Sequence, residues 1–211
     1  MADVNLIHRA HLPESGAASR LPAMVTVHGW LGNEHVMAIF ERALPEGVAV
    51  FSPRGPVIAD GGYGWFADRD AGTDFMPGLD ALHEYVRRLP EAYPLDPARI
   101  FLMGFSQGTA MGYGLMLKEP GLVAGLAALA GFLPTPAQIW AEPGRLEGKP
   151  VFIAHGMEDE RVPVVEAHRA REALTRAGAE VAYHEYPTSH KMNAQGMRDL
   201  KRWLAAVYNF S

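Results

Sequence analysis

One pentapeptide of this sequence has the residue types and the spacing of a nucleophilic serine. It runs from Gly104 to Gly108 with Ser106 at its centre, between an apolar segment (99–103) and a segment rich in Ala, Met and Leu (109–118). The first composition is typical of a buried strand and the second of a helix. Where a strand turns abruptly into a helix, the tip residue is strained and side chains two positions away on either side would collide. We therefore predict that Ser106 projects from such a turn, with the next N–H, from Gln107, directed at an oxyanion.

An acid and a base follow in the chain, each just after a segment that reads as a strand. Asp159 lies in the loop after the apolar residues 151–156, and His190 lies in the loop after 181–186, which alternate like a strand. The carboxyl ends of parallel strands lie along one edge of an open sheet, so both side chains can converge with Ser106. The chain order Ser, Asp, His is the order of α/β-hydrolase folds.

Both partner assignments have competitors. Glu158 and Glu160 flank Asp159 and could supply the acid, although the spacing from the strand favours Asp159. Of the nine histidines, His190 is the best placed, since His184 lies inside a predicted strand and others lie on a helix or near the N-terminus.

A second oxyanion donor is predicted in the loop after an earlier strand. Residues 24–28 read as this strand, and the His28-Gly29 pair opens a tight turn whose next N–H belongs to Trp30. The N–H groups of Trp30 and Gln107 would together hold the negative charge of an oxyanion. The alternative is that His28 and Trp30 simply pack the loop.

In combination these motifs resemble the phospholipase/carboxylesterase family of α/β-hydrolases, to which the acyl-protein thioesterases belong. The resemblance covers nearly the whole chain and rests on His28-Gly29 with Gly32-Asn33-Glu34, the serine pentapeptide, Gly131 to Pro134, His155-Gly156 with Asp159 and Val162-Pro163, and His190. It implies a catalytic triad of Ser106, Asp159 and His190. The longer segment from His28 to Asn33, and Thr109 where thioesterases carry a glycine, are more similar to the small bacterial esterases of the group.

The elements that must position these residues alternate between strand and helix. Strands are predicted near 24–28, 48–52, 99–103, 123–129, 151–155 and 181–186, and helices near 35–43, 76–89, 109–118, 164–177 and 194–208. Such alternation predicts a mostly parallel central sheet with helices on both faces. We expect a single α/β-hydrolase domain over residues 1–211, without a separate lid domain, in which the first twenty residues form a short edge hairpin.

Two long segments without clear periodicity, 52–74 and 132–149, leave strands at the predicted catalytic edge. Loops of this length are usually functional or disordered. We expect their aromatic residues to line an apolar substrate pocket; these are Trp65, Phe66, Phe132 and Trp140. The alternative is that these rings pack the loops onto the core.

Composition excludes several classes of function. The net charge of −5 without a basic cluster argues against nucleic acid and anionic membranes. The chain has no cysteine for a thiol nucleophile, and no His-Glu-x-x-His or similar ligand spacing, so we expect neither a metal nor a cofactor. A signal peptide and an apolar run long enough to span a bilayer are absent from the sequence, which favours a cytoplasmic location. The oligomeric state, including a homodimer, is left open.

The chemistry expected of this site is two-step acyl transfer to serine. The leading interpretation is a hydrolase of carboxylic esters with small or medium acyl groups. Its activity should increase as pH rises through about 6 to 7, where the histidine loses its proton. The alternatives are an acyl thioesterase or lysophospholipase, amide or peptide cleavage by the same triad, and a non-catalytic ligand-binding protein on the same scaffold.

Overall fold

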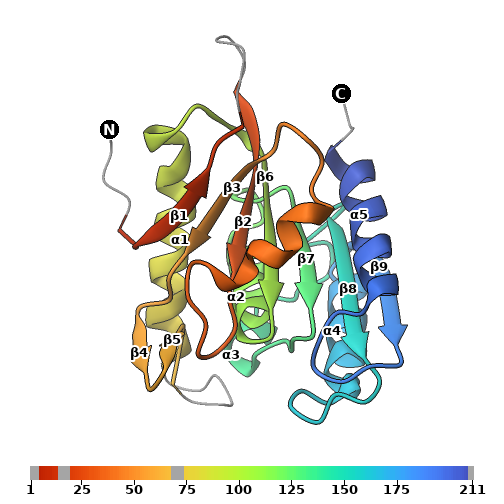
Figure 1. The fold of residues 1–211 in the computed structure, drawn as a ribbon. Helices are drawn as coiled ribbons and strands as arrows, with labels where there is room; N and C mark the ends of the chain where they lie inside the picture. Colours follow the sequence, from red (N-terminus) through yellow and green to blue (C-terminus); the bar gives the residue numbers. More distant parts are fainter. Residues whose placement is uncertain (1–4, 14–19, 68–73, 209–211) are drawn as a thin grey trace.

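The computed structural model describes residues 5–13, 20–67 and 74–208, and its centre is a seven-stranded sheet (Figure 1). The strands lie in the order β1 (His8–His11), β3 (Ala49–Pro53), β2 (Leu21–Val27), β6 (Leu95–Phe105), β7 (Gly125–Leu129), β8 (Pro150–Gly156) and β9 (Glu180–Tyr186). All neighbouring strands of this sheet are parallel except β1, which is antiparallel to β3. The predicted, mostly parallel central sheet is therefore confirmed.

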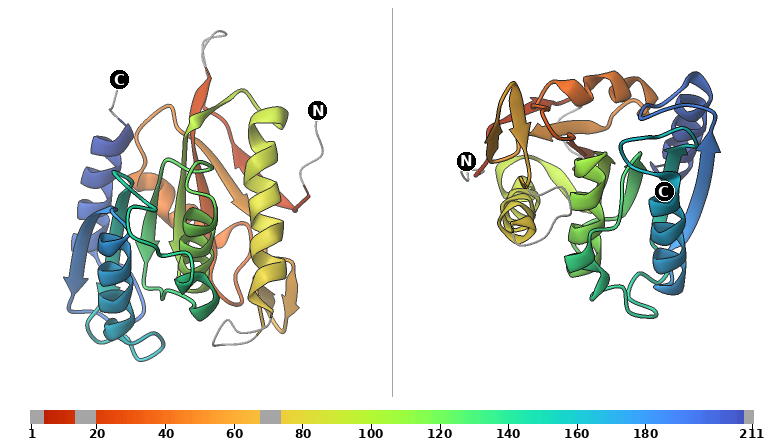
Figure 2. Two further views of the ribbon diagram at one scale, coloured as in Figure 1. Left: turned by 180° about the vertical axis from the view of Figure 1, so that it is seen from behind. Right: turned by 90° about the horizontal axis from the view of Figure 1, so that it is seen from below.

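Helices cover both faces of this sheet (Figure 2). One face packs against α1 (Phe75–Ala92), α2 (Gln107–Lys118) and α4 (Val164–Arg176), and the other against η1 (Val36–Ala43) and α5 (Ala194–Tyr208). Side chains alternate between the two layers, since Ile100 and Leu102 of β6 join the first and Phe101 and Met103 join the second. None of the described segments forms a separate lid domain.

The structure corrects two local predictions. The helix expected near 35–43 is a 3-10 helix, because its buried residues, Met37, Phe40 and Ala43, recur every three positions. The expected N-terminal hairpin is wrong in its pairing, because β1 pairs with β3 rather than with the next strand. Residues 1–4 and 14–19 of that segment lie outside the described residues.

Neither of the two long segments is wholly irregular. The first contains a hairpin of β4 (Val57–Ala59) and β5 (Gly62–Gly64), whose two-residue turn is Asp60-Gly61, with Gly61 at φ 88°. Asp-Gly is a strong hairpin signal, but strands of three residues are too short to show periodicity. The second contains the short helix α3 (Thr135–Gln138). Residues 68–73 of the first segment lie outside the described part of the chain.

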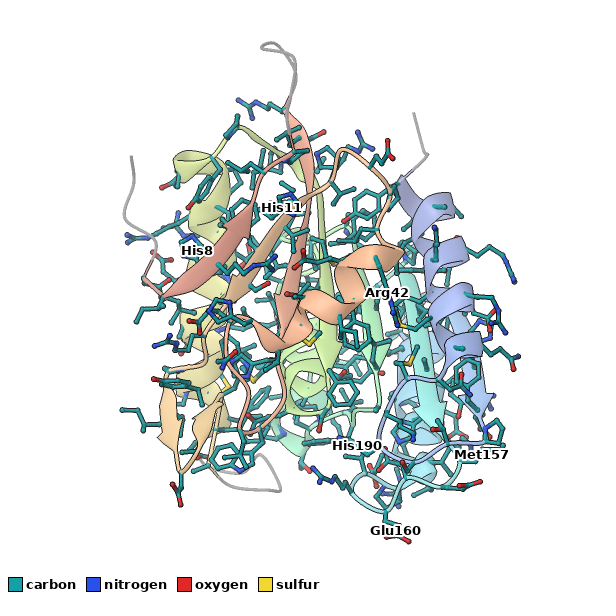
Figure 3. The ribbon with its side chains drawn as sticks, in the orientation of Figure 1. His8, His11, Arg42, Met157, Glu160 and His190 are labelled. Carbon is teal, nitrogen blue, oxygen red and sulfur yellow. The ribbon has the colours of Figure 1, made fainter. Side chains whose placement is uncertain are left out.

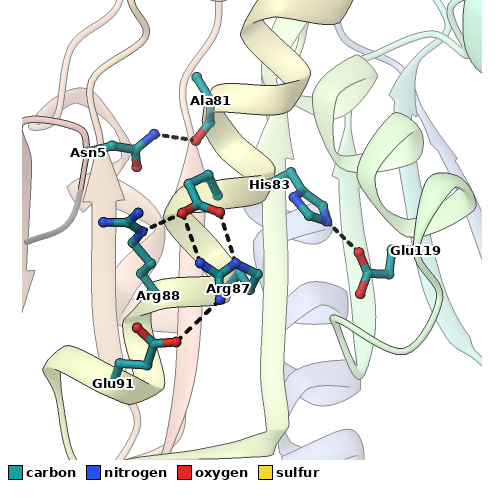
Figure 4. A network of polar contacts seen from close by, with 8 residues as sticks. Asn5, Ala81, His83, Arg87, Arg88, Glu91 and Glu119 are labelled. Carbon is teal, nitrogen blue, oxygen red and sulfur yellow. Dashed lines mark hydrogen bonds and ion pairs between the residues drawn. The ribbon is translucent and has the colours of Figure 1, made fainter. Parts of the chain in front are cut away.

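The outer face of α1 is polar and carries a network of ion pairs (Figure 4). Arg87 donates to Glu84 through Nε at 2.8 Å and through Nη2 at 2.9 Å, and its Nη1 donates to Glu91. His83 contacts Glu119 just beyond the end of α2, which joins the two neighbouring helices. Among the described segments, no helix combines the length and the apolar character needed to cross a membrane.

Candidate active site

Ser106 occupies a strained turn between β6 and α2. Strand β6 ends at Phe105 and helix α2 begins at Gln107, and between them Ser106 has φ 54° and ψ −115°. A non-glycine residue rarely adopts this backbone, which costs on the order of 1–3 kcal/mol. The turn is held on both sides, because the Ser106 N–H donates to the Leu129 carbonyl at 2.9 Å and the Ser106 carbonyl accepts from the Thr109 N–H at 3.0 Å. Ser106 is thereby placed at the carboxyl edge of the sheet.

The two glycines of the pentapeptide are required for different reasons. A Cβ on Gly104 would lie 2.4 Å from the Gly108 carbonyl oxygen, which is the predicted collision across the turn. A Cβ on Gly108 would instead lie 1.9 Å from the Val27 carbonyl oxygen, so this glycine lets α2 pack against the end of β2. The second contact lies between elements distant in sequence, and the motif alone did not indicate it.

Thr109 is buried in this turn. In the sequence it stood out only because thioesterases carry a glycine at this position. Its hydroxyl lies 2.8 Å from the Gly104 carbonyl oxygen and 2.9 Å from the Leu129 carbonyl oxygen, and it accepts from the Leu129 N–H at 3.0 Å. The hydroxyl therefore joins the ends of β6 and β7 directly below Ser106.

His190 and Asp159 come together as the sequence predicted. His190 Nδ1 lies 2.6 Å from Asp159 Oδ2, and Asp159 Oδ1 accepts the N–H groups of Arg161 and Val162 at 2.9 Å each. The Asp159 side chain is fully buried, whereas Glu158 and Glu160 are exposed and form neither a hydrogen bond nor an ion pair with His190. Figure 3 shows Glu160 directed outward below His190. Asp159 thus places the imidazole proton on Nδ1 and leaves Nε2 as a base.

A second histidine, His155, is buried beside this pair. Its Nε2 donates to the Val162 carbonyl at 2.8 Å and lies 3.4 Å from Asp159 Oδ2. Burial lowers the pKa of His155, so the ring is neutral at neutral pH. In the sequence the His155-Gly156 pair contributed only to the family likeness, although its position at the end of the predicted strand places it close to Asp159.

The Trp30 loop passes directly beside Ser106. A Cβ on Gly29 would lie 3.3 Å from Ser106 Cβ, and within the described residues neither the Trp30 N–H nor the Gln107 N–H donates to a protein acceptor. Both N–H groups are therefore available to a bound group. His28, by contrast, packs the loop: its buried ring accepts the Gly55 N–H at Nε2 over 2.9 Å.

Ser106 and His190 line one groove of about 1890 Å³. Along η1 and the segment that leads into α5 it is lined mainly by apolar side chains, together with the cationic Arg42 and Lys191; the apolar ones are Val36, Met37, Ile39, Phe40, Met192 and Met197. A second part follows α4 and is charged, with Glu166, Arg169, Glu172 and Arg176. Phe66 and Phe132 line the groove as predicted. The groove therefore offers both apolar and charged surface to a bound group.

Trp65 and Trp140, which we expected in the substrate pocket, do not line this groove. Trp65 is completely buried in the core, and its indole N–H donates to the His28 carbonyl at 3.0 Å. Trp140 is partly buried and packs against the core. For these two rings the structure supports the alternative, in which aromatic residues attach the long segments to the body of the protein. Within the described residues, no cluster of three His, Asp or Glu side chains could hold a metal ion.

Known proteins similar to this chain show its family and its fold. The profile of the phospholipase/carboxylesterase family matches residues 24–208. Acyl-protein thioesterase 1 of Debaryomyces hansenii is 25% identical over 171 residues, 74% of this chain and 73% of that protein. Carboxylesterase SOBER1 of Arabidopsis thaliana is 26% identical over 52% of this chain, and the match spans about half of that relative, 49%. A solved carboxylesterase of Bacillus cereus has a TM-score of 0.86 at 22% identity, covering 97% of this chain and 96% of that one, which confirms the α/β-hydrolase fold.

Replacing Gly108 with alanine is expected to destabilise the protein strongly. Because the new Cβ would overlap the Val27 carbonyl oxygen, Gly108→Ala should lower the free energy of unfolding by about 3 kcal/mol or more, measured by denaturant titration. Gly121→Ala is the matched control, since a Cβ there meets nothing within 4 Å, and it should stay within about 0.5 kcal/mol of wild type. Equal stabilities of the two variants would contradict the packing described here.

The buried, neutral His155 should make stability depend on pH. In the unfolded chain a histidine takes up a proton below about pH 6.5, while the lowered pKa of folded His155 resists it. The free energy of unfolding should therefore fall as pH decreases below about 6.5. His155→Gln, whose amide can still donate to Val162, should show a shallower slope between pH 6.5 and 5. Identical slopes in both proteins would rule out this contribution.

Proposed function

Because the chain belongs to the phospholipase/carboxylesterase family of hydrolases, we propose that it cleaves carboxylic esters through an acyl-serine intermediate. The observation that carries the proposal is the strained Ser106 at the end of β6, in one groove with a His190 that is bonded to a buried Asp159. At φ 54° the Ser106 backbone has a conformation that costs free energy for any residue other than glycine. Such strained conformations concentrate at functional sites.

The first step of the proposed reaction forms the acyl-serine. His190 Nε2 removes the Ser106 proton as the hydroxyl oxygen attacks the ester carbonyl, and the carbonyl oxygen becomes an oxyanion. The N–H groups of Trp30 and Gln107 hold this oxyanion. Asp159 stabilises the imidazolium that forms, since its Oδ2 accepts from Nδ1. The protonated His190 then donates to the leaving alcohol.

The second step releases the acid. A water molecule takes the place of the alcohol, His190 removes a proton from it, and the water oxygen attacks the acyl-serine carbonyl. The same two N–H groups hold the second oxyanion. As it collapses, the bond between the acyl carbon and Ser106 Oγ breaks, the acid leaves, and His190 returns its proton to Ser106. The open groove gives water access to the acyl-serine.

Removing the nucleophile or its supporting acid should abolish most of the activity. Ser106→Ala should lower kcat on p-nitrophenyl esters by about 10⁴- to 10⁶-fold, and Asp159→Asn by about 10⁴-fold through the wrong imidazole tautomer. Glu158→Gln is the control, because Glu158 is exposed and does not contact His190. Its kcat should match that of wild type. Hydrolysis by Ser106→Ala at the wild-type rate would refute the proposed mechanism.

An acyl thioesterase is the second candidate, favoured by the similarity to an acyl-protein thioesterase and by the apolar part of the groove. Matched oxygen esters and thioesters with the same acyl chain separate the two functions. For a carboxylesterase we expect kcat/KM for the oxygen ester to equal or exceed that for the thioester across chain lengths. A thioester preference of about tenfold or more would make thioesterase the better description.

A further inference from the structure

The loop that carries the Trp30 N–H is covered by the β4–β5 hairpin. The Tyr63 N–H donates to the Gly32 carbonyl at 2.9 Å, which forms an isolated β-bridge between hairpin and loop. A Cβ on Gly62 would lie 2.2 Å from the Leu31 carbonyl oxygen, and one on Gly64 would lie 2.2 Å from the Trp30 ring. The hairpin therefore lies against the loop with no room for even a methyl group.

An ion pair ties the same two segments together. Arg54, just after β3, donates from Nε to Glu34 at 2.7 Å, and its Nη2 contacts the second carboxylate oxygen. The guanidinium also lies 4.5 Å from the centre of the Tyr63 ring in the hairpin. The Glu34 side chain is only 9% exposed, and the bonds to Arg54 lower its pKa to about 2. This carboxylate is therefore charged throughout the physiological range.

The second donor, Gln107, is attached to the end of the same segment. Its side-chain Oε1 accepts the Trp65 N–H at 2.8 Å, and its Nε2 donates to the Phe66 carbonyl at 2.7 Å. These are the only hydrogen bonds that the carboxamide makes within the described part of the chain, and the side chain is buried. One continuous stretch, residues 54–66, therefore contacts the supports of both N–H donors.

We propose that residues 54–66 act as a clamp that sets the spacing of the two oxyanion donors, with Glu34 and the Gln107 carboxamide as the positioning groups that fasten it. The inference rests on the proposed function, because an oxyanion has to form for the spacing to matter in catalysis. The two donors come from different elements, the loop after β2 and the start of α2. The clamp supports both donors. Loosening its contact with the Trp30 loop, or its bonds to the Gln107 carboxamide, would move one donor relative to the other.

The clamp should affect the transition state more than substrate binding. A lost oxyanion donor typically costs 10²- to 10³-fold in kcat, and we expect a displaced donor to cost about tenfold or more. Glu34→Gln, which removes the charge but keeps the shape, and Gln107→Met, which removes both carboxamide bonds, should each lower kcat by about that factor. KM should stay within about twofold, because the donors act on charge that develops only during the reaction.

Glu41→Gln is the matched control. The Arg9–Glu41 pair is also bidentate and partly buried. Its side chains are 29% and 17% exposed, and those of Arg54 and Glu34 are 25% and 9% exposed. It joins β1 to η1 and does not contact the Trp30 loop or residues 54–66. Its loss should leave kcat and KM unchanged.

Hydrogen exchange tests the clamp without any reaction. Exchange of the Tyr63 amide, followed by NMR, should become about tenfold faster in Glu34→Gln and in Gln107→Met, and should not change in Glu41→Gln. Unchanged exchange in Glu34→Gln and Gln107→Met would overturn the proposal. Faster exchange in these variants with an unchanged kcat would also overturn it, and so would a rise in KM without a fall in kcat. If wild type and Ser106→Ala are equally inactive, the proposed function fails instead, and the exchange result still decides whether the clamp exists.

Discussion

The close approach of helix α2 to the end of strand β2 is the contact on which the site depends. Only a glycine fits at position 108, where the backbone lies against the Val27 carbonyl. This approach forces the chain to turn from β6 into α2 within one residue, so Ser106 takes up the positive φ and its side chain reaches the groove. It also brings the Gln107 N–H next to the loop that follows β2. The positions of Ser106 and of the Gln107 N–H at this edge of the sheet therefore depend on a single packing contact.

His190 and Asp159 reach the same edge through a second backbone contact. A Cβ on Gly156, the last residue of β8, would lie 2.3 Å from the carbonyl oxygens of Thr188 and Ser189, so the loop carrying His190 packs directly on this strand end. The Glu158 N–H donates to the Thr188 carbonyl at 3.0 Å, which joins the Asp159 and His190 loops. In both halves of the site, a glycine allows one backbone to lie against another, and this contact places Ser106 in one half and His190 in the other.

The sequence predicted the parts of the structure that depend on local patterns. The core strands and the longer helices follow from apolar periodicity, and the positions of Ser106, Asp159 and His190 follow from the rule that strand ends share an edge. Contacts between distant segments were not predictable in this way. Trp65 looked like a pocket residue because it lies in a long loop, yet it enters the core and bonds to His28. The edge pairing of β1 and the role of Gly108 likewise depend on partners that no local pattern indicates.

In the proposed mechanism, Ser106 is a nucleophile activated by His190 and Asp159. The most direct measurement is labelling with a fluorophosphonate, with the modified residue located by mass spectrometry of peptides and the residual esterase activity measured in parallel. This mechanism predicts one adduct per chain, on Ser106, formed in step with the loss of activity and much more slowly in His190→Gln. Full activity after Ser106 has been modified, or inactivation by an adduct on another residue, would contradict it.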